Sequence, residues 1–314
     1  MEKIIDNVQF IIDKYSLLDN GETAYVGLSG GKDSVVACFI LRDMGYNVIP
    51  IIIDVGDAGF DATKIKYNID KSGFDAKIIS IYDNDFINVF SENEKKDIQN
   101  KLNYLLDVPD NQSACTTCYN LKLTAFQQFF SKSDNGKIVI AQHKDDMITS
   151  MMKCYWTHKY YHNITKINSI SYDGYLMKEY ISKNKLDINL LSKLVKEGLA
   201  ATDDPIREFP LDNLEIIRPL ARVDEETLQK YVDDISYDVI NGDNSCRYRR
   251  KEPRPFRLLV QWDLEKRLKD NPALKNTLYD YVIKGLDKRG MLKFRPRNLR
   301  EVLYPGFKKF IKKY

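Results

Sequence analysis

Long apolar runs are absent from this sequence of 314 residues. No stretch approaches the roughly 20 apolar residues that a membrane-spanning helix needs. The first residues, Met1–Asp6, include acidic side chains and lack the apolar core of a signal peptide, so they predict a plain amphipathic helix. Internal repeats and low-complexity linkers are absent as well. We therefore expect a cytoplasmic protein with no membrane partner.

Cysteine is scarce, and its count of five is odd. An odd, small number of cysteines in a chain expected in the cytosol argues against a disulfide framework and favours metal binding or catalysis. Cys38 and Cys154 fall within apolar helical stretches and are expected to be buried small hydrophobic residues. The other three, Cys115, Cys118 and Cys246, are the candidates for chemistry.

Neither charge sign is in large excess, but the charges are unevenly distributed. Residues 245–314 hold 21 Lys and Arg against 7 Asp and Glu, a net of +14, whereas the rest of the chain holds 27 against 38, a net of −11. Such a basic segment indicates a polyanionic partner, nucleic acid first. The alternative is that these charges form a solvated face.

Apolar strands alternate with helical patterns along most of the chain. The run at 47–54 is almost continuously apolar, as expected for a parallel strand covered on both faces. Further strands are expected at 23–28, 76–81, 138–141 and 215–217, and helices at 1–18, 35–41, 61–72, 84–106, 145–157, 187–199, 224–235, 255–269 and 272–289. This order predicts an α/β fold with a doubly wound parallel sheet, whose ligand lies beyond the carboxyl ends of the strands.

The same pattern suggests four regions. Residues 1–20 form an N-terminal helix, 21–158 a nucleotide-binding domain, and 213–314 the end of the sheet with a helical, basic C-terminal region. Between them, residues 159–212 are expected to be an insertion, acting either as a lid that contacts the substrate or as the interface of a homodimer.

A glycine-rich turn, Ser29-Gly30-Gly31-Lys32-Asp33-Ser34, lies between the first strand and its helix. Such a turn directs backbone N–H groups and the positive end of the helix dipole at an anion above it. Ser29 and Ser34 add hydroxyl groups and Lys32 a positive charge. The spacing differs from the Walker A pattern. The alternative is an ordinary Gly-Gly strand–helix turn.

Cys115-Thr116-Thr117-Cys118 can supply two thiolates to one metal centre. There is no second Cys-x-x-Cys pair to complete a four-thiolate zinc site, and Cys246 is the nearest supplement. Three thiolates leave one coordination position open. The pair could instead be a redox dithiol, or half of a zinc site shared across a dimer, with Cys246 an ordinary loop cysteine.

A third segment, Ala141–Met147, follows the strand at 138–141 directly. Here His143 can line a nucleotide pocket, and Asp145 or Asp146 can hold Mg²⁺ against phosphates. The alternative is a helix start whose acidic residues favour the dipole.

Together these motifs resemble the PP-loop ATP pyrophosphatase superfamily, enzymes that split ATP into AMP and pyrophosphate. A PP-loop (Ser29–Ser34), a Cys-x-x-Cys pair and a distal cysteine resemble in particular the iron–sulfur enzymes of tRNA 2-thiolation, which make 2-thiocytidine and 2-thiouridine. The segment at 141–147 resembles their Gly-His-x-x-Asp-Asp motif, with Gln142 where glycine is usual. Arg218-Pro219-Leu220 also recurs in these enzymes.

The resemblance implies an adenine nucleotide α-hydrolase-like fold and a [4Fe-4S] cluster on Cys115, Cys118 and Cys246. It further implies that Ser29–Ser34 and His143 bind ATP, and that Asp33 and Lys122 take part in catalysis. Lys122 has a second interpretation as an ordinary helix lysine. Residues 159–212 and the basic tail have no counterpart in the family.

The implied reaction is ATP-dependent sulfur transfer to a nucleobase carbonyl, in tRNA or another nucleic acid, from sulfide or a persulfide carrier. Alternatively, a cysteine carries the persulfide itself and no cluster is needed. Other PP-loop activities stay open: lysidine-type ligation, sulfur chemistry on DNA or small molecules, or desulfidation. A nonenzymatic nucleotide- or RNA-binding module with a structural metal is the alternative of a different class.

Overall fold

A computed structural model describes residues 2–56, 60–107, 114–131, 136–160, 206–211, 213–240 and 255–291. The chain divides into two compact units. Unit 1 combines Met1–His143 with Ile206–Pro253, and unit 2 combines Lys144–Pro205 with Arg254–Tyr314. Each unit is described by itself below.

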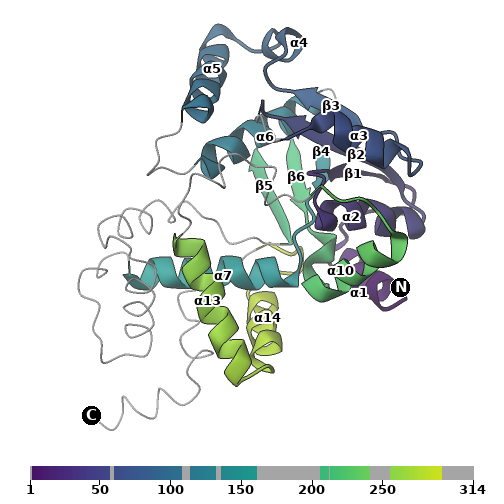
Figure 1. Cartoon of the computed structure of the whole chain (residues 1–314), viewed down its shortest axis with the longest axis vertical. Coiled ribbons are helices and arrows are strands. Elements are labelled where there is room, and N and C mark those ends of the chain that lie inside the picture. Colours follow the sequence, from purple (N-terminus) through teal and green to yellow (C-terminus); the bar gives the residue numbers. More distant parts are fainter. Residues whose placement is uncertain are drawn as a thin grey trace. The chain divides into compact units, whose positions relative to one another are not determined.

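Unit 1 is built around a six-stranded sheet with the order β3-β2-β1-β4-β6-β5 (Figure 1). The strands are β1 (Thr23–Gly27), β2 (Asn47–Asp54), β3 (Lys77–Ser80), β4 (Gly136–Val139), β5 (Arg207–Leu211) and β6 (Leu214–Ile217). All neighbours pair in parallel except β5, which runs antiparallel to β6 at the edge of the sheet. The predicted α/β fold with a doubly wound, mostly parallel sheet is confirmed.

The apolar side chains of the central strands determine their buried position in the sheet. In β2, Ile51 and Ile52 point to opposite faces, and both are fully buried. Ile51 belongs to a core that also contains residues of β4 and β6 and the apolar sides of two helices, α5 (Glu92–Leu106) and α6 (Cys115–Phe129). On the other side, α2 (Lys32–Asp43) packs against β1 and β2. Helices on both faces explain why β2 lacks polar alternation.

The other described helices of unit 1 are α1 (Glu2–Tyr15), α3 (Ala62–Asp70), α4 (Asn84–Ile87), α10 (Glu225–Ile235) and the 3₁₀ helix η3 (Pro219–Arg222). Local chemistry sets several of their ends. Asp61 caps α3 by accepting a hydrogen bond from the backbone N–H of Lys64, and Ser91 with Glu94 forms a capping box at the start of α5. α10 packs against α2, which carries the PP-loop at its start.

Three helices are described in unit 2: α7 (Lys144–Tyr160), α13 (Pro255–Asp270) and α14 (Leu274–Lys284). α7 packs against both of the others. The Lys144 ammonium donates a hydrogen bond to the Asn276 side-chain oxygen (2.8 Å), so the start of α7 is tied to α14. Within the described residues, no helix is both long and apolar enough to cross a membrane.

The β5 strand was not predicted, whereas each predicted strand is present within two or three residues of its expected ends. The predicted helix at 187–199, most of the predicted insertion and nearly all of the basic tail at 290–314 lie outside the described residues. The region boundaries after residues 20, 158 and 212 stay predictions.

Candidate functional site

The order of the strands places two loops at one point of the sheet. On one side of β1, the sheet continues with β2 and then β3. On the other side, it continues with β4, β6 and β5 in that spatial order. Loops that leave adjacent parallel strands in opposite directions open a crevice at the carboxyl edge. The PP-loop follows β1, and Gln142 with His143 follows β4. The sequence-predicted site is therefore at the switch point of the sheet.

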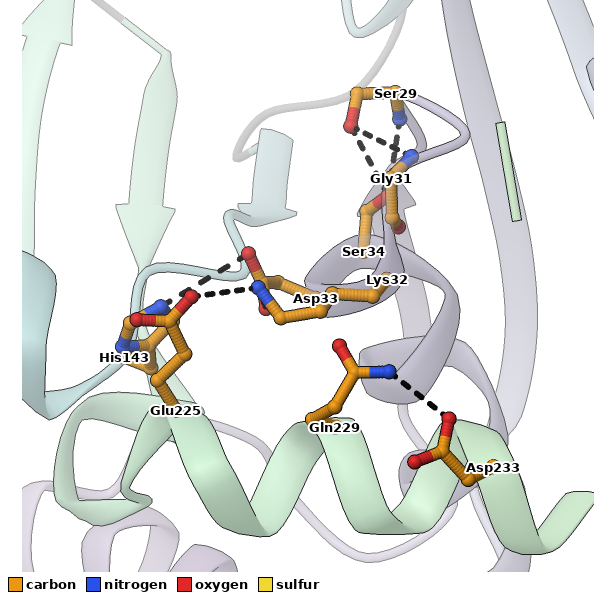
Figure 2. Close-up of polar contacts among 9 residues, drawn as sticks. All are labelled: Ser29, Gly31, Lys32, Asp33, Ser34, His143, Glu225, Gln229 and Asp233. Carbon is orange, nitrogen blue, oxygen red and sulfur yellow. Dashed lines mark hydrogen bonds and ion pairs between the residues drawn. The ribbon is translucent and has the colours of Figure 1, made fainter. Parts of the chain in front are cut away.

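The PP-loop is braced by its own hydroxyl groups (Figure 2). The Ser34 hydroxyl donates to the Gly31 carbonyl oxygen (2.9 Å) and accepts from the Ser29 backbone N–H (3.2 Å). The Ser29 hydroxyl lies 3.2 Å from the Ser34 hydroxyl and accepts from the Gly31 backbone N–H (3.4 Å). Because Ser34 is only 5% exposed, this network is internal and holds the loop in one shape.

The two glycines of the PP-loop have different surroundings. Gly30 has a φ of +80°, and a Cβ atom there would lie 2.8 Å from the Ile65 side chain. Its carbonyl oxygen accepts a hydrogen bond from the Ile240 backbone N–H (3.0 Å). Gly31 has an ordinary φ of −77°, and a Cβ atom there would meet only the Ser29 hydroxyl, at 3.5 Å. Gly30 thus serves the fold, while Gly31 leaves the space above the loop open.

Among the described residues, no side chain forms a capping hydrogen bond at the start of α2, whose N-cap is Gly31. Backbone N–H groups in the first turn of a helix have no carbonyl partner within that helix, and the dipole adds positive potential. This end of α2 therefore has the properties of an anion site.

Beside the PP-loop, the charged side chains of Lys32, Asp33 and Glu225 lie close to one another, and His143 lies next to Asp33 (Figure 2). The Lys32 ammonium lies 2.9 Å from a Glu225 carboxylate oxygen and 3.4 Å from one of Asp33. The other Asp33 oxygen is 3.9 Å from the Nε2 atom of His143, which is 4% exposed. Burial lowers the pKa of Lys32, but Glu225 and Asp33 outweigh this effect and the pKa is raised above its usual value. Lys32 is thus a fixed cation at the mouth of the loop.

No family model matches the chain. Over 48 residues, 15% of this chain, it is 42% identical to a tRNA-5-methyluridine(54) 2-sulfurtransferase of Pyrococcus horikoshii, covering 16% of that protein. Over 145 residues, 46% of this chain, it is 25% identical to a tRNA-cytidine(32) 2-sulfurtransferase of Histophilus somni, covering 43% of that protein. These matches span less than half the length of each relative.

Among solved structures, the U34-tRNA thiolase NcsA from Methanococcus maripaludis, with its [4Fe-4S] cluster, superposes with a TM-score of 0.53 at 18% identity. The match covers 91% of this chain and 80% of that chain. The chain resembles the PP-loop enzymes of tRNA thiolation. At this identity the structural likeness shows the fold, and it agrees with the PP-loop sheet described above.

In this PP-loop chain, the predicted thiol site begins on α6, which starts at Cys115. Cys118 is partly buried and borders the core, and Lys122 follows one turn later. Cys246 lies outside the described residues, and within the described part no group of three His, Cys, Asp or Glu side chains is arranged so that it could hold a metal ion. The assignment of the cluster to these cysteines stays a prediction. Cys38, by contrast, is fully buried on α2 as expected, and burial raises the pKa of its thiol.

The predicted magnesium ligands, Asp145 and Asp146, lie in the first turn of α7 in unit 2. There the Asp145 carboxylate forms an ion pair with the Lys275 ammonium at 2.6 Å. Asp145 therefore has a structural partner on α14, and the metal role of both carboxylates stays a prediction.

Sequence reasoning missed Glu225 and gave Arg218 no role. Glu225 opens α10, where an acidic residue is ordinary, so nothing local marks it as the partner of Lys32. Arg218 is 2% exposed and donates to Gln142 and Glu208. The sequence feature that pointed to Arg218 was the Arg-Pro-Leu motif, but the motif gave no indication of what Arg218 contacts.

Proposed function

We propose that this protein is an AMP-forming, ATP-dependent sulfurtransferase that activates a nucleobase carbonyl in tRNA and replaces its oxygen with sulfur. The observation that carries the proposal is the braced PP-loop at the switch point of the sheet, with Lys32 and His143 beside it. A rigid loop at an uncapped helix start is suited to phosphate binding. A carbonyl oxygen is a poor leaving group, so attaching AMP to it makes substitution feasible.

Each residue near the loop has a role in this activation step. The first-turn N–H groups of α2 would bind the phosphates of ATP, and the Lys32 ammonium would neutralise charge that builds on the departing pyrophosphate. Asp33 lies 3.4 Å from Lys32 and 3.9 Å from His143, so it would orient both side chains. Separately from these residues of unit 1, Asp145 and Asp146 in the first turn of α7 are the proposed ligands of Mg²⁺.

The described part of the thiol site fits a [4Fe-4S] cluster. Cys115 begins α6 and Cys118 follows three residues later, a spacing at which two residues lie on one face of a helix. Cys246 is the proposed third ligand. When bound, such a cluster supplies an iron with one position open for sulfide. Lys122, on the second turn of the same helix, would balance negative charge on the activated oxygen.

The proposal of tRNA as acceptor has two supports. The matched relatives are named as tRNA 2-sulfurtransferases, acting at position 54 or 32. In addition, residues 245–314 carry a net charge of +14, suited to a phosphate backbone. Sulfide or a persulfide carrier is the proposed sulfur donor.

The test is anaerobic purification followed by iron and sulfide assay, ATP turnover, and mass spectrometry of the nucleosides of co-incubated tRNA. We expect iron and sulfide, conversion of ATP to AMP that depends on tRNA, and a thiolated nucleoside. Cys118→Ser and Cys246→Ser should lose iron and thiolation while retaining ATP binding. Cys38→Ala is the matched control, since this fully buried thiol should not ligate iron.

The outcomes separate the alternatives. Retention of iron and thiolation in Cys246→Ser would refute the three-cysteine cluster. Thiolation by an iron-free protein would favour a cysteine persulfide. ATP binding without any turnover would favour the nonenzymatic binding module.

A further inference from the structure

Four polar side chains form a continuous chain of contacts across unit 1. The Tyr119 hydroxyl on α6 donates to one carboxylate oxygen of Glu208 on β5 (3.1 Å). The other Glu208 oxygen accepts from the Arg218 Nη2 atom (2.8 Å). The Arg218 Nε atom donates in turn to the side-chain oxygen of Gln142, in the loop after β4. The contacts join segments that are far apart in the sequence.

Arg218 is the rigid centre of this chain. Its side chain is 3% exposed, and a buried guanidinium must be paired and hydrogen-bonded to be tolerated. Its backbone is also fixed, because its N–H donates to the Ile206 carbonyl oxygen (2.9 Å) directly after β6. The planar guanidinium presents Nε and Nη2 at a fixed angle, so Gln142 and Glu208 are held relative to each other.

The two ends of the chain of contacts adjoin the two halves of the predicted site. Tyr119 is the residue after Cys118, on the helix that carries the Cys-x-x-Cys pair. Gln142 is the residue before His143, whose imidazole lies 3.9 Å from the Asp33 carboxylate in the PP-loop. A displacement at Asp33 in the PP-loop would reach α6 through His143, its neighbour Gln142, and the hydrogen-bonded side chains of Arg218, Glu208 and Tyr119.

We infer that Arg218 is a positioning residue that couples occupancy of the PP-loop to the position of α6 and its thiols. The inference rests on the proposed function for one element, the binding of ATP at the PP-loop. It also explains Gln142, which stands where the resembling enzymes usually have glycine: glycine has no side chain that Arg218 could bind. The contact between Arg218 and Gln142 is thus the part of the coupling that depends on a residue particular to this chain.

The test compares amide hydrogen exchange of residues 115–122 with and without ATP in the full-length protein, with ATP affinity measured separately by calorimetry. In the wild type, ATP should slow this exchange by at least about fivefold, the low end of a coupling between sites. Tyr119→Phe removes only the hydroxyl group that donates to Glu208. Gln142→Met replaces the side chain that accepts from Arg218 with an apolar one of similar size. Both should bind ATP within about twofold of the wild type but reduce the effect on α6 to below about twofold.

Tyr67→Phe is the matched control, because Tyr67 is an exposed tyrosine on α3 away from the chain of contacts. It should retain the full response of α6. The inference is overturned if Tyr119→Phe and Tyr67→Phe respond to ATP alike, or if the wild type binds ATP without a change in α6. In both cases the proposed function survives. Failure of the wild type to bind ATP at all would instead overturn both together.

Discussion

At the scale of single residues, the two neighbouring glycines of the PP-loop meet different requirements. Gly30 is needed for the fold, and Gly31 for the proposed binding of a phosphate. Gly30 has a positive φ and no room for a Cβ atom beside Ile65. Gly31 has an ordinary φ and faces open space. A methyl group added at each position therefore tests a different property.

Replacing Gly30 with Ala should lower the free energy of unfolding by about 2–3 kcal/mol. Left-handed backbone costs an alanine about 1–2 kcal/mol, and displacing Ile65 from 2.8 Å adds to this. Urea denaturation followed by circular dichroism measures the change. A loss below about 0.5 kcal/mol, the range of an ordinary surface substitution, would contradict the packing described for this loop.

Replacing Gly31 with Ala should leave the free energy of unfolding within about 0.5 kcal/mol of the wild type. It should nevertheless weaken ATP binding by at least about tenfold, because the added methyl group occupies the space above the helix start where a phosphate would approach. Calorimetric titration with ATP measures this. Unchanged ATP affinity in Gly31→Ala would show that the nucleotide does not approach the loop there.

The contact between Glu225 and Lys32 bears on the proposed binding of ATP. The pair is 2.9 Å apart, so a phosphate bound by the Lys32 ammonium would displace or share the contact. Glu225→Gln should therefore strengthen the binding of ATP or inorganic pyrophosphate by about twofold to fivefold, in line with the modest energy of a partly exposed ion pair. Glu226→Gln, in the same helix turn and also exposed, is the control and should have no effect. Equal affinities for the two variants would refute the competition.

At the scale of elements, α10 is attached to α2 at both ends of their contact. Near the start of α10, Glu225 binds Lys32, and later on the helix the Tyr231 hydroxyl donates to the Asp43 carboxylate (2.8 Å). Tyr231 is 5% exposed, and burial together with Asp43 raises the pKa of its phenol. α10 thus forms one wall of the PP-loop and depends on α2 for its position.

Tyr231→Phe should lower the free energy of unfolding by about 1 kcal/mol, since it removes one hydrogen bond to a carboxylate that is itself exposed. ATP affinity should fall by less than about threefold, because the Lys32–Glu225 contact remains. Paired urea and calorimetric titrations measure both quantities. Destabilisation as small as that of the exposed Tyr67→Phe would show that the hydroxyl contributes nothing to this packing.

The elements differ in how much of them the sequence could predict. β2 was predicted residue for residue, because a strand buried on both faces is an unbroken apolar run. β5 was missed, since it lies at the sheet edge, contains Pro210, and has only partly buried or exposed residues with no alternation between them. An edge strand is determined by its neighbour, here β6, rather than by a pattern of its own.

At the scale of the whole molecule, alkaline pH should destabilise the fold. Burial, followed by nearby Cys38 and Asp238, raises the pKa of Tyr237 to about 12, against an ordinary value of 10.0. Above pH 10 the unfolded chain therefore loses this proton while the folded chain keeps it, and stability falls as pH rises toward 12.

Tyr237→Phe should remove part of this loss, about 0.5 kcal/mol once solvent screening of the half-buried ring is allowed for. The measurement is the urea midpoint at about pH 8 and about pH 11 for both proteins. The variant should show the smaller decrease. A decrease equal to that of the wild type would mean that the Tyr237 phenol titrates as freely in the folded chain as in the unfolded one.

The site as a whole was only partly predictable. The PP-loop and His143 were found because each is a short motif directly after an apolar strand, and parallel strands bring such loops to one edge. Glu225 and Glu208 were not found, because their partners Lys32 and Tyr119 lie 193 and 89 residues away in the chain. Contacts at such separations depend on the register of the sheet, and no local pattern records that.

The discontinuity of unit 1 has a consequence during synthesis. β4 ends at Val139, but its neighbour β6 begins only at Leu214, after the first part of unit 2. At roughly 5–20 residues per second, a ribosome needs about 4–15 s to cover that interval, during which β4 has one unpaired edge. During the same time, Gln142 lacks its hydrogen-bond donor Arg218. A chain that ends between residues 144 and 205 therefore lacks β6, and one edge of β4 is left without its partner strand.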